Sequence, residues 1–86
     1  MRGKQIDGLA ATEPSEAMAS AVWFDSLMMH VCLLDGREIS VPLQWFPKLR
    51  NATDEQRKGW RLIGKGVGIH WEDLDEDISV AALLKG

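Results

Sequence analysis

Two histidines, a single cysteine and a run of acidic residues are the groups in this 86-residue chain that could do chemistry. Histidine titrates near neutral pH and can act as a base or a metal ligand, and a cysteine thiolate is a nucleophile. A catalytic or metal site needs several such groups to converge. Apart from the acids that directly follow His70, neither His30 nor His70 has a cysteine or carboxylate at ligand spacing. The sequence therefore predicts no catalytic residue, no metal site and no cofactor.

The acidic run covers residues 72–77, and its acids alternate like part of a calcium-binding loop. Counted from Asp73, such a loop requires Gly at its sixth position and Glu at its twelfth, where this chain has Ile78 and Leu84. The pattern therefore does not indicate a calcium site. Two interpretations remain: a solvated surface that keeps the domain soluble, or a surface that meets a partner.

Three glycines, at positions 64, 66 and 68, resemble a phosphate-binding loop. No helix start and no Gly-Lys-Ser/Thr ending follows them, so they are interpreted as a hairpin turn. Cys32 is the only cysteine, which excludes an intrachain disulfide and fits a reducing cytoplasm. Because it lies in an apolar run, it is expected to behave as a small hydrophobic residue.

The charge of the chain argues against general binding of nucleic acids. The net charge is −3, and nucleic-acid affinity depends mainly on basic residues. The charge is unevenly distributed, since the charged residues of segment 48–65 are mostly bases and those of segment 72–77 are all acids. Basic residues interleaved with tryptophans can also bind single strands by stacking, which leaves nucleic-acid binding as an alternative. No apolar run is long enough to cross a membrane.

The elements that must position these residues can be predicted from pattern. Asp35-Gly36 between two apolar segments indicates a hairpin over residues 22–42 with a type I′ turn, and Pro42 must end its second strand. Residues 1–20 are predicted to be a flexible tail, and residues 21–86 a single domain. His30 lies in the first strand and His70 in the last, so a small enzyme around both rings is a further alternative.

The second half of the chain is predicted to contain short elements. A helix is expected from about residue 43 or 44 to 51, and Thr53 to Gln56 matches a capping box that opens a helix over residues 54–59. A second hairpin follows at residues 60–71. The chain then ends in a helix from Ser79, as N-cap, to Lys85. The fold class predicted from these elements is α+β, with a small, mainly antiparallel sheet built from two hairpins, short helices and a C-terminal helix.

Three long motifs, in residues 35–49, 55–71 and 74–80, resemble a family of short bacterial proteins of unknown function. They read D-G-R-x-I-x-V-P-L-x-W-F-P-x-L, E-Q-R-x-x-W-x-L-I-G-x-G-x-G-I-H-W and L-D-E-D-I-S-V. The resemblance implies an α+β fold. Some members carry an additional helix-turn-helix domain, which this chain is not expected to have. Genes of the family often neighbour those of a second family, so the resemblance also implies an antitoxin-like component of a two-gene module.

Together these observations predict a cytoplasmic, non-enzymatic module that binds another protein, which is expected to be basic. The alternatives are an acidic, phage-type inhibitor of a nucleic-acid-processing machine and a nucleic-acid-binding accessory domain. A homodimer through an edge strand or an apolar face is also open. Trp71 is expected to be the apolar anchor of the binding surface. The residues predicted to bind the partner are Arg37, Trp45, His70, Trp71, Glu72, Asp73, Asp75, Glu76 and Asp77.

Overall fold

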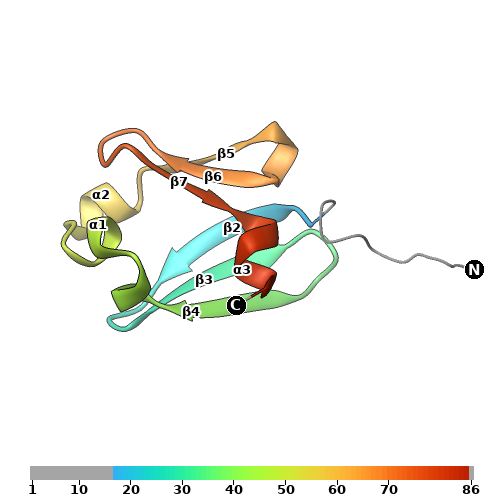
Figure 1. Ribbon diagram of the computed structural model, residues 1–86, viewed down its shortest axis with the longest axis horizontal. Helices are drawn as coiled ribbons and strands as arrows, with labels where there is room; N and C mark the ends of the chain where they lie inside the picture. The colour runs from blue at the N-terminus through green and yellow to red at the C-terminus, as the bar shows by residue number, and fades with distance from the viewer. Residues whose placement is uncertain (1–16, 86) are drawn as a thin grey trace, which may run out of the picture.

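The computed structural model describes residues 17–85, which form two small antiparallel sheets and a few short helices (Figure 1). The α+β fold class is therefore confirmed. The first sheet has the order β2-β3-β4, with β2 at Ala19–Phe24, β3 at Met28–Leu33 and β4 at Glu38–Pro42. The second has the order β5-β6-β7, with β5 at Trp60–Ile63, β6 at Gly68–Trp71 and β7 at Glu76–Ser79. Each sheet therefore contains one strand more than the two of the predicted hairpin.

The last residues of the predicted tail, residues 1–20, belong to the first sheet. Ala19 is only 1% exposed and opens β2, although it falls within the predicted flexible segment. The backbone N–H of Leu34 also donates to the carbonyl of Met18 at 3.0 Å. The rest of that prediction, residues 1–16, lies outside the described residues.

An unpredicted turn at Asp25 divides the first apolar run into two strands. Its carboxylate oxygen Oδ1 accepts hydrogen bonds from the backbone N–H groups of Leu27 and Met28, at 2.8 and 2.7 Å. An Asp side chain closes a turn in this way without any glycine or proline. The residues before the turn form β2 and pair antiparallel with those after it, as Phe24 does with Met29.

The turn at Asp35-Gly36 is present, but the predicted type I′ geometry is wrong. Gly36 has a φ of +98°, whereas Asp35 is not in the positive-φ region. Leu33 accepts from the N–H of Gly36 at 3.1 Å and donates to the carbonyl of Arg37 at 2.8 Å. This is the three-residue hairpin loop in which only the last residue needs a positive φ, the conformation that glycine adopts most easily.

Most of the short helical segments lie between the two sheets in the sequence. The segment predicted as one helix is divided into η2 (Leu43–Trp45) and α1 (Pro47–Arg50), with Pro47 at the start of α1. The capping box is confirmed at α2 (Asp54–Arg57), where Thr53 and Gln56 cap each other reciprocally. The last helix, α3 (Val80–Lys85), follows β7, and the Ser79 hydroxyl accepts from the N–H of Ala82.

The core lies between the sheets, because alternate residues of each strand point inward. Its largest fully buried members are Trp71, Met29, Leu49, Ile69, Val31 and Val80. Trp71 reaches from β6 to the first sheet, where its ring lies edge-on to that of Phe24, with the ring centroids 6.5 Å apart. The two sheets also meet at η3 (Gly64–Gly66), where a Cβ on Gly66 would lie 2.5 Å from the carbonyl oxygen of Ala19.

Among residues 17–85, no helix is long and apolar enough to cross a bilayer.

Candidate functional site

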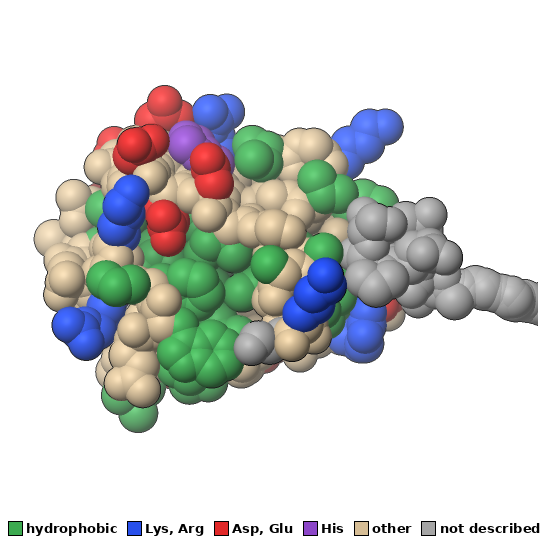
Figure 2. Space-filling model, viewed as in Figure 1, with side chains coloured by type: hydrophobic (Ala, Val, Ile, Leu, Met, Phe, Trp, Pro, Cys, Tyr) green, Lys and Arg blue, Asp and Glu red, His purple; other side chains and the backbone are tan. Residues whose placement is uncertain are grey.

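The acidic run forms the connection between β6 and β7 and the first half of β7 itself. Glu72, Asp73, Asp75 and Asp77 are exposed, and Glu76 is half-buried. Asp75 has a φ of +51°, which short polar side chains tolerate better than most others. In Figure 2, acidic side chains gather with a histidine at one end of the visible face. We call residues 72–77 the acidic turn.

Four side chains form a polar row across the outer face of the second sheet. They are Arg61, His70, Glu72 and Asp77. Arg61, His70 and Asp77 are cross-strand partners on β5, β6 and β7. The His70 ring contacts the Asp77 carboxylate through Nδ1 and lies 3.4 Å from Glu72 through Nε2. Arg61 Nη2 donates to Glu72 Oε1 at 3.1 Å. The structure therefore brings three of the predicted partner-binding residues, His70, Glu72 and Asp77, into contact with one another.

The bases that contact the acidic turn within the described part of the chain are few. Arg61 pairs with Glu72, and Lys48 of α1 donates from Nζ to the backbone carbonyl of Asp75 at 2.8 Å. The Lys48 bond uses a carbonyl and leaves the Asp75 carboxylate to solvent. The acidic turn thus carries an excess of negative charge. The Lys48 hydrogen bond holds α1 beside it.

Trp71 cannot be the apolar anchor of a binding surface, because its side chain is 0% exposed. The alternation along β6 explains this correction: His70 faces outward, so Trp71 must face the core. Its indole Nε1 donates to the carbonyl of Arg57 at 3.0 Å, which satisfies its only polar group. Trp71 instead forms the base from which the acidic turn projects.

Two other predicted residues lie away from the polar row. Arg37 belongs to the β3–β4 loop, where its Nε donates to Asp35 at 2.8 Å. Trp45 lies on η2 with 52% of its surface exposed. Only Phe46 separates Trp45 from α1, and Lys48 of α1 contacts the acidic turn.

A second polar cluster on the outer face of the first sheet was missed from the sequence. His30 is hydrogen-bonded through Nε2 to Asp25 Oδ2 at 2.8 Å and through Nδ1 to Ser40 Oγ at 2.7 Å. The Trp23 indole stacks on this imidazole, with ring centroids 3.8 Å apart and planes 14° from parallel. The period-two alternation and the pairing of His30 with Ser40 are the signals that could have revealed it.

Two groups in and beside the His30 cluster have pKa values displaced from their ordinary values. The hydrogen bond from His30, together with the N–H groups of Leu27 and Met28, holds the pKa of Asp25 below its ordinary value. Burial raises the pKa of the Cys32 thiol, and the neighbouring Glu38 carboxylate raises it further. Since a thiol with a raised pKa is a poor nucleophile at neutral pH, Cys32 is consistent with the structural role predicted for it.

The lowered pKa of Asp25 predicts a specific acid sensitivity. A group with a depressed native pKa contributes stability above its unfolded pKa, about 3.9, and loses it as the pH falls through the native value. Asp25→Asn is therefore expected to lower the free energy of unfolding above pH 4, with the difference from wild type shrinking as the pH falls. Urea unfolding across pH 2–7 measures it. Glu55→Gln, at an exposed acid of α2, is the control; an equal pH dependence of both variants would contradict the prediction.

The two histidines do not form a common centre. His30 and His70 lie in different sheets, each with its own partners. The polar partners of His70 contact opposite nitrogens of the ring, which does not suit chelation of one ion. No group of three or more His, Cys, Asp or Glu side chains that could hold a metal occurs among the residues placed by the structure.

This two-sheet α+β domain with an acidic turn corresponds to a known family. The model of the family described as "Protein of unknown function (DUF2442)" matches residues 19–86, so the chain belongs to this family. The predicted resemblance to a family of unknown function is confirmed at that level. The match begins at the first residue of β2.

A crystal structure from Rhodospirillum rubrum ATCC 11170, described as a protein of unknown function, is similar to this chain in sequence and in fold. The two are 33% identical, with a TM-score of 0.71, and the match covers 83% of this chain and 88% of that one. No curated protein matches the chain.

Proposed function

We propose that this chain is a non-enzymatic protein-binding module that presents the acidic turn to a basic partner. One observation carries the proposal: five carboxylates occur within six residues at one end of a packed sheet, and few bases among residues 17–85 contact them. A surface of one sign attracts an oppositely charged partner and speeds its association, with a smaller effect on the final affinity.

The scaffold beneath the acidic turn supports this role. Trp71 is buried directly before the turn, and Ile78 is buried within β7 directly after it. Lys48 fastens α1 to the backbone of the turn. A surface held in this way loses little conformational freedom on binding, which favours affinity. Trp45 takes the place of Trp71 as the proposed apolar contact, since half of its surface is available to a partner.

An antitoxin-like role is the finer form of this proposal. An antitoxin can neutralise its partner simply by covering it, which requires a binding surface and no catalytic group. An inhibitor of a nucleic-acid-processing machine would use the same carboxylates in place of phosphates. The antitoxin and the inhibitor differ in the identity of the partner that the acidic turn binds.

The proposal is tested by capturing partners from the source cell with tagged protein. Wild type is compared with a five-site variant, Glu72→Gln, Asp73→Asn, Asp75→Asn, Glu76→Gln and Asp77→Asn. A charge-matched control neutralises five acids elsewhere: Asp25→Asn, Asp35→Asn, Glu38→Gln, Asp54→Asn and Glu55→Gln. We expect wild type and the control to recover a specific basic protein that the five-site variant does not recover. Circular dichroism checks that the control is folded. Equal recovery by all three would remove the acidic turn from the binding surface.

A further inference from the structure

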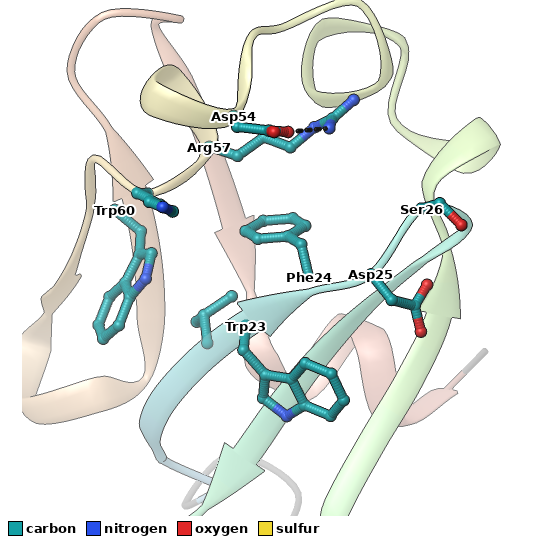
Figure 3. A pocket seen from close by; sticks show the side chains of 9 residues that line it. Trp23, Phe24, Asp25, Ser26, Asp54, Arg57 and Trp60 are labelled. Carbon is teal, nitrogen blue, oxygen red and sulfur yellow. Dashed lines mark hydrogen bonds and ion pairs between the residues drawn. The ribbon is translucent and has the colours of Figure 1, made fainter.

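A cleft of about 490 Å³ opens between the end of β2 and the segment that joins α2 to β5 (Figure 3). Its volume lies in the range of sites that bind small molecules. Trp23 and Trp60 lie on different sides of it in Figure 3, with Phe24 between them and Arg57 above. The remaining lining residues are Val22, Asp25, Ser26, Asp54 and Lys58.

Trp23 is held rigidly although 47% of its surface is exposed. One face of its indole stacks on His30, and its Nε1 donates to Glu38 Oε1 at 3.3 Å. His30 is itself fixed by Asp25 and Ser40. An aromatic ring fixed in this way can stack on a ligand without the entropic cost of ordering a mobile side chain.

The charged groups of the cleft differ in whether they already have partners. Arg57 donates to the carbonyls of Leu49 and Arg50, each at 2.8 Å, and to Asp54 at 3.2 Å. Asp25 is bound to His30 and to backbone N–H groups. Lys58 makes no ion pair with any residue in the range 17–85. Of the two cations that line the cleft, Arg57 and Lys58, Lys58 is thus the one without an ion pair among the described residues.

We infer that this cleft binds a small molecule in which a flat aromatic ring carries an anionic group, as in a nucleoside monophosphate. The ring would stack on Trp23, and the anion would meet Lys58. The inference goes beyond the proposed function, because none of the lining residues belongs to the acidic turn. Both acids of the cleft already accept hydrogen bonds within the chain, Asp25 from His30 and Asp54 from Arg57.

The test uses AMP as the probe and backbone amide chemical shifts as the readout. We expect saturable shifts confined to residues 22–26 and 54–60. Adenosine is expected to bind more weakly, because it lacks the anion, and ribose 5-phosphate not to bind, because it lacks the ring. Trp23→Ala is expected to weaken AMP binding at least about fivefold, the lower end of the range for stacking on one aromatic ring. Trp45→Ala, which removes another half-exposed tryptophan outside the cleft, is the matched control and is expected to leave the affinity unchanged.

Lys58→Ala provides a second variant that leaves the stacked rings in place. It is expected to weaken AMP severalfold and to leave adenosine unchanged. The five-site variant of the acidic turn is expected to bind AMP like wild type, which separates this inference from the proposed function. Absence of saturable shifts up to about 10 mM AMP, or equal losses in Trp23→Ala and Trp45→Ala, would overturn it. So would binding of a single-stranded oligonucleotide with none of AMP, since that would indicate a nucleic-acid surface.

Discussion

Trp71→Ala is expected to cost about 3–5 kcal/mol of unfolding free energy, as large-to-small substitutions of buried aromatics do. The side chain is completely buried, meets Phe24 across the sheets and donates its N–H to the carbonyl of Arg57. Its removal leaves a cavity between the two sheets and a carbonyl without its donor. Because small domains have about 5–15 kcal/mol in total, the variant should be barely folded. Urea unfolding followed by circular dichroism measures the loss.

Two further variants separate the causes of that loss. Trp71→Phe keeps an aromatic ring but removes the N–H donor, so we expect an intermediate cost of about 1–3 kcal/mol. Trp45→Ala removes a tryptophan that is 52% exposed, and we expect a cost below about 1 kcal/mol. If Trp45→Ala destabilised the protein as much as Trp71→Ala, the assignment of one tryptophan to the core and the other to the surface would be wrong.

Gly66→Ala is expected to be the most damaging of the small substitutions. Its φ is +107°, and a Cβ there would lie 2.5 Å from the carbonyl oxygen and 3.1 Å from the nitrogen of Ala19. Both are backbone atoms, so relief requires η3 and β2 to move apart, and these elements join the two sheets. We expect a loss of several kcal/mol, about as much as a disrupted core contact costs.

Gly36→Ala is the matched control for that experiment. Its φ of +98° is nearly the same, and a Cβ there would meet nothing within 4 Å. It therefore reports the backbone strain alone, about 1–2 kcal/mol. The difference between the two variants in urea unfolding isolates the contact between the sheets. Equal losses would show that the approach of Gly66 to Ala19 does not hold the sheets together.

The features predicted correctly are those encoded by residues close in sequence. Thr53 and Gln56 cap a helix through local hydrogen bonds, and Gly36 permits a turn through its own φ. Ser79 caps α3 in the same local way. These signals do not depend on what packs against the segment, so they can be recognised from the sequence alone.

The features that were missed depend on pairing with distant residues. The polar segment Glu76–Ser79 forms β7 because β6 lies beside it, and its strand propensity alone is low. The turn at Asp25 is an exception, because local hydrogen bonds close it, but its run contains no glycine or proline that would signal a turn. The residue type of Trp71 could not show which face of β6 it would occupy, and the buried position removed it from the predicted binding surface.

The same reasoning applies to the candidate site. The acids of residues 72–77 are adjacent in sequence, so their clustering could be predicted. The contacts of His30 with Asp25 and Ser40 join three segments, and the cleft beside Trp23 needs α2 to fold against the end of β2. Neither arrangement has a signature within any single segment.

The central claim, that the acidic turn meets a basic partner, is tested most directly by the association kinetics of the partner recovered with wild type. The association rate should fall steeply between low and physiological salt, because exposed charges are screened over about a Debye length. The five-site variant should associate more slowly at low salt and show little salt dependence, and the charge-matched control should behave like wild type. A rate that is independent of salt in the wild type, or the same in all three proteins, would contradict the account.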